Sequence, residues 1–406
     1  MKQKISPLSA ALLNSTFIQG FELDDWHSEA PLHSNSIILP ALLAAAEHFK
    51  PGSGSSSPIN GSSFLLAYLT GLEVGPRVGN ALYGSHMLTR GWHSGAVFGP
   101  SASATAVCKM FNLPANKIED AVGIACTQAC GLMSAQYESE VKRMQHGFAA
   151  RNGLFAAILA KNDYVGIKKV YERPYGGFLT MFGQGSGKNP AYLENEITEA
   201  LGVKWQTMGV RVKPHAAMAG THCTIDCIRK LQAKHPEQMK DLASITSIKY
   251  EMAEAALRHG GWLAKRPLTA TGAQMSNSYV AATQIVDGQV LPAQFRHDQL
   301  ERNDVWELVE KTTCVTSDEF SNKWLQRATI EFKNKPTLVG TVEAPRGVDP
   351  AMTNEDILEK WRALVKGVIG DERREEIERM CLGLEGLEDI TQLGRLLIGI
   401  TRNPIA

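Results

Sequence analysis

The sequence predicts a mainly helical protein that carries a smaller α+β part. Residues 1–190 are rich in Ala, Gly and Leu, with apolar residues at helical spacing. From about Lys204 the pattern changes to alternating, β-branched segments, and from Thr353 a charged amphipathic pattern returns. We therefore predict a large helical domain formed by residues 1–208 and 348–406, with an α+β lid over residues 209–347.

The elements of the large domain follow from that periodicity. A Gly/Ser-rich stretch over residues 51–58 predicts a loop. Thr353 stands three residues before Asp356, which is typical of a helix N-terminus. The expected helices are 6–20, 36–49, 63–84, 92–111, 116–134, 144–160, 371–383 and 388–398.

The lid is expected to mix strands with helices. Alternating β-branched residues predict strands, whereas longer apolar periods predict helices. The expected strands are 207–214, 245–253, 328–334 and 337–345, and the expected helices are 216–233 and 272–287.

Composition excludes several classes of protein. Lys plus Arg and Asp plus Glu each number 42 in 406 residues, so there is no basic field for nucleic acid. Apolar runs are interrupted before 18 residues, which predicts no membrane span, and the N-terminus makes a poor signal peptide. Seven scattered cysteines suit reduced thiols in a cytoplasmic protein.

Two cysteine pairs are candidate metal ligands. Cys126 and Cys130 are four residues apart, as are Cys223 and Cys227 beside His222, and zinc sites admit such spacing. Both pairs lie in helical sequence, where a four-residue spacing repeats one helix face, and small buried cysteines are common there. Core packing is the favoured interpretation and a metal site the alternative.

The stretch from Glu22 to His33 is the densest set of chemical groups in the chain. It holds four carboxylates and two histidines within twelve residues, directly after an apolar helical run. Burial and mutual contact would move the pKa values of such groups toward neutrality, as proton transfer requires. The alternative is a solvated acidic turn.

Four further places carry candidate groups, each with a structural alternative. His93 precedes a predicted helix, where the helix dipole favours anions, but it could simply cap that helix. Lys142 and Arg143 also precede a helix and could form a solvated basic turn. Lys213 could end an exposed strand, and Tyr279 could be a core aromatic. Phosphate-loop, dinucleotide, nucleophile-elbow and zincin motifs are absent from the sequence.

Together these segments resemble the MmgE/PrpD family. The blocks run in the order FELDDWHSEAPLH, RGWHSGAVFG, ACGLMSAQYESEVKRMQHGFAARNG, VRVKPHAAMAGTHCTIDCI and AQMSNSYVAATQIVDGQ. The resemblance runs from about residue 8 to the C-terminus and is greatest to the fungal members that decarboxylate cis-aconitate. It implies a helical domain with an α+β lid, a homodimer, a small tri- or dicarboxylate substrate, and no metal or organic cofactor.

The resemblance also implies roles for individual residues. It assigns Lys213, His222 and Arg143 to substrate binding. Glu22, Trp26 and His215 stand where many relatives have Asp, Thr and an aromatic residue, respectively. The implied catalytic residues are Asp24, Asp25, His33, His93, Lys142 and Tyr279.

The family pattern also has several dozen residues ahead of this chain's first block. We therefore expect the first helices of the helical domain to be missing. An apolar face on the segments after Ser36 should then stand open.

The implied reaction is decarboxylation of cis-aconitate to itaconate, or of an alkylated analogue. Cations would stabilise the charge that develops on loss of CO2, and His93 would protonate the resulting carbon. The family also contains 2-methylcitrate dehydratases, whose chemistry needs nearly the same groups, so dehydration stays an alternative. A second alternative is a non-catalytic, truncated homologue.

Overall fold

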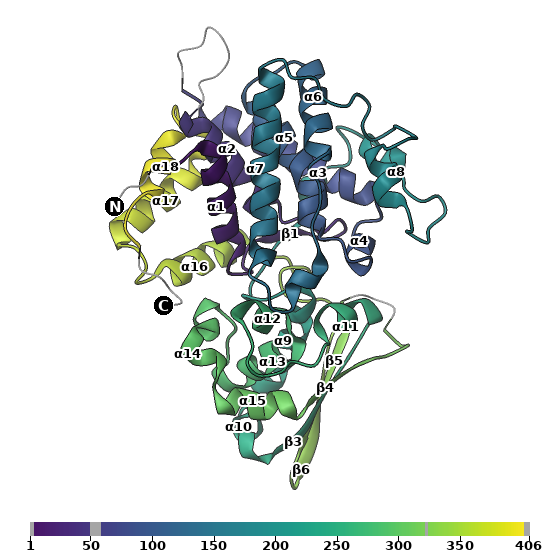
Figure 1. Ribbon diagram of the computed structural model, residues 1–406. Helices are drawn as coiled ribbons and strands as arrows, with labels where there is room; N and C mark the ends of the chain where they lie inside the picture. Colours follow the sequence, from purple (N-terminus) through teal and green to yellow (C-terminus); the bar gives the residue numbers. More distant parts are fainter. Residues whose placement is uncertain (1–3, 49–57, 321–323, 402–406) are drawn as a thin grey trace.

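The computed structural model describes residues 4–48, 58–320 and 324–401. Figure 1 shows a bundle of long helices above a smaller lid that holds a mixed sheet. The predicted fold class, a large helical domain with an α+β second part, is confirmed. The exact domain boundaries stay a prediction, and most of the predicted loop at 51–58 lies outside the described residues.

The helical part contains two groups of helices. The first group is α1 (Pro7–Gln19), α2 (Ser34–His48), α3 (Gly61–Ala81), α4 (His86–Thr89), α5 (Ser94–Met110), α6 (Ala115–Cys126), α7 (Val141–Lys161) and α8 (Phe178–Gly183). The second group is α16 (Asn354–Val365), α17 (Asp371–Leu382) and α18 (Thr391–Leu397).

Helix α5 is the centre of the bundle. It packs against α2, α3, α6 and α7, and every residue of it except Lys109 is buried. Its Ala, Gly and Ser residues leave little side chain between neighbouring helices, which suits close packing. Large side chains such as Phe98 fill the remaining space, each fully buried one contributing about 1.5–3 kcal/mol.

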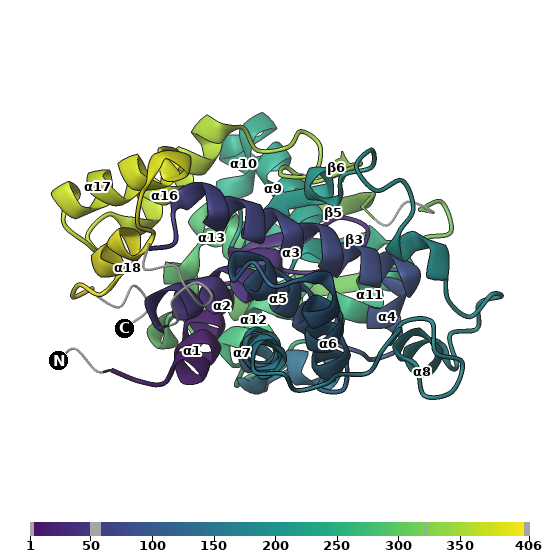
Figure 2. The ribbon, with the colours of Figure 1, turned by 90° about the horizontal axis from the view of Figure 1, so that it is seen from above.

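The C-terminal helices return to the same bundle. Ile377, Met380, Ile390 and Leu393 join the helical hydrophobic core. Figure 2 shows α16, α17 and α18 at one end of the bundle and α8 at the other. The helical core therefore combines both ends of the described chain.

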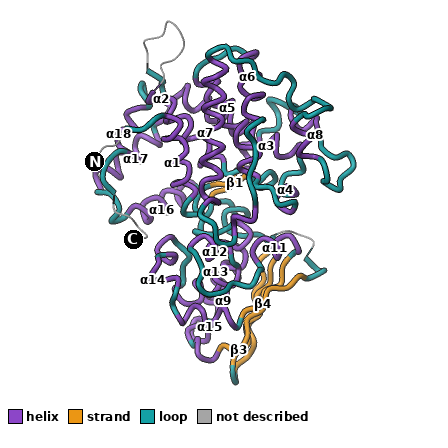
Figure 3. The backbone as a smooth tube through the Cα atoms, in the orientation of Figure 1, coloured by secondary structure: helices purple, strands orange, loops and turns teal. Residues whose placement is uncertain are grey.

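The lid packs helices against a four-stranded sheet. The strand order is β4-β3-β5-β6, with β3 parallel to β4 and antiparallel to β5, and β5 antiparallel to β6. Helices α9 and α13 cover the sheet, and Figure 3 shows these strands confined to the lid. The lid strands are β3 (Ile245–Met252), β4 (Thr312–Thr316), β5 (Gln326–Phe332) and β6 (Lys335–Val342). The lid helices are α9 (His222–Lys234), α10 (Pro236–Lys240), α11 (Glu254–Gly260), α12 (Ala270–Met275), α13 (Asn277–Asp287), α14 (His297–Leu300) and α15 (Asn303–Glu310).

Three element predictions were wrong in instructive ways. The helix expected at 116–134 ends at Cys126, because residues 130–132 pair with the segment before α5. The helix expected at 216–233 begins at His222, because the Ala216 and Met218 amides donate to Val290 and Gln274 instead. The helix expected at 272–287 is broken at Ser276, whose hydroxyl accepts from the Tyr279 amide and caps α13.

The strand predicted at 207–214 does not belong to the lid sheet. Its central part, β2 (Val210–Val212), pairs antiparallel with β1 (Asp25–His27) of the acidic segment. The acidic segment is therefore half of a two-stranded ribbon and not a solvated turn. Strand β4 was not predicted at all.

The expectation of an open apolar face after Ser36 was wrong for α2, whereas Leu66 and Leu69 of α3 are exposed. Ile37, Ile38, Ala41 and Leu42 are fully buried against the other helices of the bundle. Within the described ranges, no helix is long and apolar enough to cross a membrane.

Candidate active site

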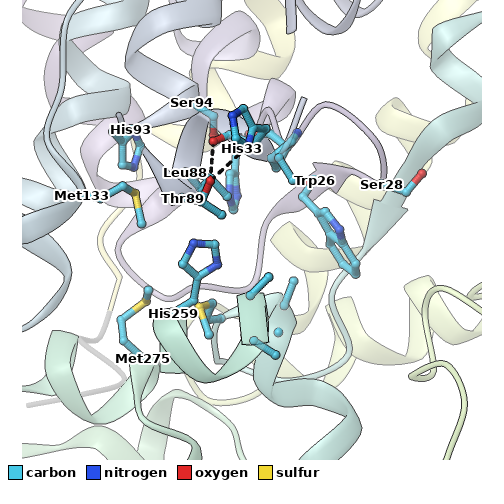
Figure 4. Close-up of a pocket in the computed structure, with 18 of the residues that line it drawn as sticks. Trp26, Ser28, His33, Leu88, Thr89, His93, Ser94, Met133, His259 and Met275 are labelled. Carbon is cyan, nitrogen blue, oxygen red and sulfur yellow. Dashed lines mark hydrogen bonds between the residues drawn. The ribbon is translucent and has the colours of Figure 1, made fainter. Parts of the chain in front are cut away.

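A cavity of about 460 Å³ lies between the helical part and the lid. We call two of its surfaces the charged wall and the lid floor. The charged wall consists of Glu22, His33, His93, Lys142 and Lys213. The lid floor consists of Met218, Ala219, Gly220, Ala255, Ala256, His259, Met275 and Trp324. Figure 4 shows His33 and His93 reaching into the cavity from above, opposite His259 and Met275.

The β1–β2 ribbon brings distant parts of the charged wall together. Asp25 pairs with Val212, so the next residue, Lys213, lies beside Asp24, and its amide donates to the Asp24 carbonyl at 3.4 Å. Lys360 of α16 also joins the two strands' ends. Its ammonium donates to the carbonyls of Leu23 and Lys213 at 2.6 and 2.7 Å. The ribbon thus fixes a lysine against a carboxylate 189 positions away.

Glu22 is the shared partner of three cations. Its buried carboxylate accepts hydrogen bonds from Lys142 and Arg143, and Lys213 Nζ lies 2.7 Å from its second oxygen. Burial alone would raise the pKa of Glu22, but Lys142, Lys213 and Arg143 hold this pKa well below its usual range. Glu22 is therefore an ionised carboxylate that keeps three cations in one place.

Asp24 and Asp25 have different duties although they are adjacent. Asp24 accepts from His33 Nδ1 at 3.0 Å and from Lys213 Nζ at 3.3 Å, and it orients both groups. Burial opposes ionisation of Asp24, but His33 and Lys213 keep its pKa below the usual value. Asp25 instead accepts from the amides of Ser34 and Asn35 and caps α2. Burial, with the neighbouring Asp24, raises the pKa of Asp25 to about 7.

The position of His93 fixes the form of its imidazole. His93 caps α5, and its Nδ1 accepts from the Ala96 amide at 3.4 Å. The neutral ring therefore carries its proton on Nε2. Burial, with Lys142 and His33 nearby, lowers the pKa of His93 to about 3. Gly131 supports this placement, because its carbonyl accepts from the His93 amide and its φ of +117° suits glycine.

A buried histidine lies behind the two histidines of the wall. The His146 ring is 4.9 Å from the His33 ring and 5.1 Å from the His93 ring, between centroids. Ser36 donates its hydroxyl proton to the His33 carbonyl, so the same hydroxyl accepts from His146 Nδ1 at 2.8 Å. Among the described residues, His146 Nε2 has no hydrogen-bond partner. Burial, with His33 and His93 nearby, keeps the pKa of His146 well below its usual value.

Three helix N-termini bring these groups to the cavity. His33 directly precedes α2, His93 directly precedes α5, and Lys142 lies in the first turn of α7. Each helix N-terminus carries a partial positive charge and favours an anion. The helix dipoles therefore favour a bound anion, as the two lysines do.

The two lysines of the charged wall differ in their electrostatics. Burial, with Arg143 and Lys213 nearby, lowers the pKa of Lys142 to about 8, although Glu22 opposes this. Burial would also lower the pKa of Lys213, but Glu22 and Asp24 raise it above its usual value. Lys213 is thus a fixed cation, whereas Lys142 is cationic at neutral pH and can lose its proton just above it.

The structure brings together part of the predicted site. His33, His93, Lys142 and Lys213 line the cavity, and Asp24 binds two of them. Asp25 lies behind the wall as a helix cap. His93 and Lys142, which are 49 positions apart in the sequence, thus line the same cavity.

Besides Asp24 and Asp25, three predicted residues do not line the cavity. Arg143 is occupied by Glu22, Gln19 and Gln274. His222 bonds through Nε2 to the Ala217 carbonyl at 3.0 Å, inside the lid.

Tyr279 is the third of them. It packs in the lid core beside Phe295 and Trp306, with its hydroxyl 3.4 Å from the Gln299 carbonyl. Burial raises its pKa. Tyr279 is thus a core aromatic residue of the lid, as the structural alternative predicted.

Sequence reasoning missed three residues of the site. Glu22 was placed in the acidic stretch and noted as a departure from the family pattern, but it was given no role in the site. His146 lies three residues after Arg143 of the predicted basic turn, and nothing in its spacing marks it as buried. Gln274 joins the lid to the helical part, because its amide donates to the Phe21 and Ala216 carbonyls at 3.0 and 3.1 Å.

The cysteines behave differently from one another. Cys126, Cys223 and Cys227 are buried in helices, as core packing predicts. Cys130 is exposed in the turn after α6, so the prediction that it packs in a core was wrong. Over the described ranges, no group of three or more His, Cys, Asp or Glu residues is arranged to hold a metal ion.

Comparison with known proteins matches one protein family over nearly the whole chain. The family model for the MmgE/PrpD N-terminal domain matches residues 1–189, and that for the C-terminal domain matches residues 215–384. The chain is 50% identical over 403 residues to the cis-aconitate decarboxylase-like protein oryM of Aspergillus oryzae, covering 98% of this chain and 83% of that protein.

Two relatives named as cis-aconitate decarboxylases extend the comparison. The chain is 46% identical over 412 residues to the protein of Aspergillus terreus, covering 99% of this chain and 84% of the relative. It is 26% identical over 404 residues to the human protein, covering 98% of this chain and 80% of the relative.

Proposed function

Because the chain belongs to the MmgE/PrpD family, we propose that it is a carboxy-lyase that decarboxylates cis-aconitate to itaconate. The observation that carries the proposal is the charged wall. Three helix N-termini and two buried lysines converge there on one cavity of ligand size. A small polycarboxylate is the ligand whose charge matches this arrangement.

The charged wall supports the bond-breaking step. Lys142 and Lys213 pair with the carboxylates that remain in the product. The bond between the saturated carbon and its carboxylate breaks, and CO2 leaves. The electron pair forms a new double bond, and the pair of the old double bond moves toward a carbon next to another carboxylate. Cations at that carboxylate stabilise the developing negative charge.

His93 supplies the proton in this proposal. Free His93 is neutral, since its pKa is about 3. A bound tricarboxylate places negative charges beside the ring and raises that pKa, because opposite charge favours the protonated form. The second proton adds at Nδ1 and takes the place of the hydrogen bond from the Ala96 amide, and the imidazolium then donates from Nε2. Asp24 keeps His33 and Lys213 in place through this step.

Dehydration of an alkylcitrate is the competing reaction. It needs a base to remove a proton next to a carboxylate and an acid to help hydroxide leave. Lys142, with a pKa of about 8, can act as such a base. The names of the relatives favour decarboxylation, whereas the types of residue at the site allow both reactions.

A homodimer and a cytoplasmic location complete the proposal. Phe17 on α1 is 65% exposed, and Leu13 and Ile18 of the same helix are also exposed. Apolar side chains on one exposed helix suit an interface with a second copy. Sedimentation analysis should give twice the monomer mass.

Product analysis tests the reaction directly. Purified protein is incubated with cis-aconitate and, separately, with 2-methylcitrate, and CO2 and ultraviolet absorbance are followed. We expect CO2 from cis-aconitate and no change with 2-methylcitrate, and the His93→Ala variant should lose the CO2 signal. A rise in absorbance with 2-methylcitrate and no CO2 from either acid would contradict the proposal.

A further inference from the structure

One lysine that lines the cavity lies outside the charged wall. Lys188 is on the loop that follows α8, in the helical part. The other lining residues are buried or half-buried, except Thr89 and Ala255, so these two and Lys188 mark the open side of the cavity. The Lys188 ammonium forms no ion pair with a described residue and lies 5.8 Å from the centre of the Tyr83 ring. Lys188 therefore places an uncompensated cation at the mouth of the cavity.

The loop that carries Lys188 is anchored on both sides of this residue. Before it, His86 Nε2 donates to the Ser186 carbonyl at 2.7 Å. After it, the Tyr83 hydroxyl donates to the Pro190 carbonyl at 2.6 Å. The Lys188 amide itself donates to the Ser186 hydroxyl oxygen at 3.2 Å. The backbone is thus fixed at the mouth, and the long side chain of Lys188 serves the cavity from there.

The charged wall alone does not balance a tricarboxylate. Lys142, Arg143 and Lys213 supply three positive charges to its ion pairs. Glu22 and Asp24 supply two negative charges to the same network. These ion pairs leave one net positive charge for a substrate that carries three carboxylates. A third carboxylate therefore needs a cation from elsewhere, because the transfer of an unpaired charge out of water is costly.

We propose that Lys188 binds the substrate carboxylate that leaves as CO2, and that it makes the cavity prefer the tricarboxylate substrate to the dicarboxylate product. The inference rests on the proposed decarboxylation and deepens it. Lys142 and Lys213 pair with the two carboxylates that remain in the product, so the third is the one without a partner on the wall. At the mouth, the CO2 that forms can pass directly into solvent.

The chemistry of the step sets the kinetic role of Lys188. The bond from the saturated carbon to its carboxylate breaks, and its electron pair enters the new double bond while the far carbon takes one proton. The carboxylate becomes neutral CO2, so its attraction to the Lys188 ammonium weakens on the way to the transition state. An interaction that is stronger in the ground state lowers KM and does not raise kcat.

Two variants of Lys188 and one control separate charge from structure. Lys188→Met removes the charge but keeps an unbranched side chain, and Lys188→Arg keeps the charge. Lys109, at the end of α5, is exposed and does not line the cavity. Lys109→Met therefore makes the same change in net charge away from the site.

Calorimetry with unreactive propane-1,2,3-tricarboxylate and with itaconate tests the selectivity. Lys188→Met should weaken binding of the tricarboxylate by about fivefold, the scale of a partly exposed ion pair, and should leave itaconate binding unchanged. Lys188→Arg and Lys109→Met should bind both acids as the parent does. With cis-aconitate, Lys188→Met should raise KM by a similar factor without lowering kcat.

The outcomes distinguish this inference from the proposed reaction. Selective loss of tricarboxylate affinity in Lys188→Met, with no CO2 from cis-aconitate in the parent, would support the pairing with Lys188 and contradict decarboxylation. Equal losses for the two acids, or unchanged affinity for both, would overturn the role of Lys188. A lower kcat with unchanged KM would overturn it as well.

Discussion

The charged wall and the lid floor enclose the same cavity but are held together by different forces. Buried ion pairs hold Glu22, Lys142 and Lys213 in place. Loss of one partner from such a pair leaves an uncompensated buried charge. Met218, Ala256 and Met275 are held by the packing of the lid. Loss of Glu22, the carboxylate that the wall cations share, should therefore lower stability, and loss of His93 or Lys142 should mainly lower turnover. A change to the floor should instead affect the choice of substrate.

Glu22→Gln should have the largest effect, because it leaves Lys142, Arg143 and Lys213 without the carboxylate they share. Removal of one partner from a buried ion pair costs about 3–5 kcal/mol of folding free energy. Urea denaturation measures the loss. Glu22→Asp keeps the charge and should lose less than half as much. Equal stability of Glu22→Gln and the parent would contradict the central role of Glu22.

His93→Ala and Lys142→Ala should each lower turnover by a factor of about 10² or more, the scale of a lost acid or anion contact. Their melting temperatures should change much less than that of Glu22→Gln. His297, an exposed histidine away from the cavity, provides a control, and His297→Ala should keep full turnover. Parallel losses of melting temperature and turnover would mark His93 and Lys142 as structural residues.

The pH dependence of kcat/KM should report the protonation state of Lys142 in the charged wall. The pKa of Lys142 is about 8, so its ammonium attracts the substrate below that pH and is neutral above it. We expect kcat/KM to fall by about tenfold per pH unit above 8. Lys142→Arg should remove this alkaline limb, because a guanidinium stays charged. A profile that is flat to pH 9.5 in the parent would show that Lys142 does not bind the substrate.

Asp25→Asn should have the smallest effect, and only on stability. The pKa of Asp25 is raised from 3.8 to about 7, so the folded protein binds this proton more tightly than the unfolded chain. The resulting stability is complete below pH 4 and is lost as the pH rises through 7. Between pH 5 and pH 8, the free energy of unfolding of the parent should therefore fall by about 1–3 kcal/mol relative to that of Asp25→Asn. A constant difference between the two proteins would argue against a proton on Asp25.

The sequence was a good guide to the wall and a poor guide to the floor. Periodicity located the long helices, and the residues just before α2, α5 and α7 stood out because charged groups before apolar runs are unusual. Ala255 and Met218 carry no such signal, since alanine and methionine occur in any helical core. Their role depends on which side of the lid faces the bundle, and that is set by tertiary contacts such as those of Gln274.

The same limit explains the errors within the site. Glu22 and Asp24 look alike in sequence, and only the β1–β2 ribbon shows that one collects three cations while the other orients His33. His222 and Tyr279 were assigned by resemblance alone. The structure gives both of them partners inside the lid.

A crystal structure with bound propane-1,2,3-tricarboxylate would show directly which side of the cavity holds the carboxylates. We expect the charged wall to hold carboxylates and the lid floor to contact only carbon. Carboxylate oxygens should lie within hydrogen-bond distance of Lys142 Nζ and His93 Nε2, with carbon atoms facing Met275 and Ala256. A ligand with its carboxylates turned to the lid floor, away from Lys142 and His93, would contradict this expectation.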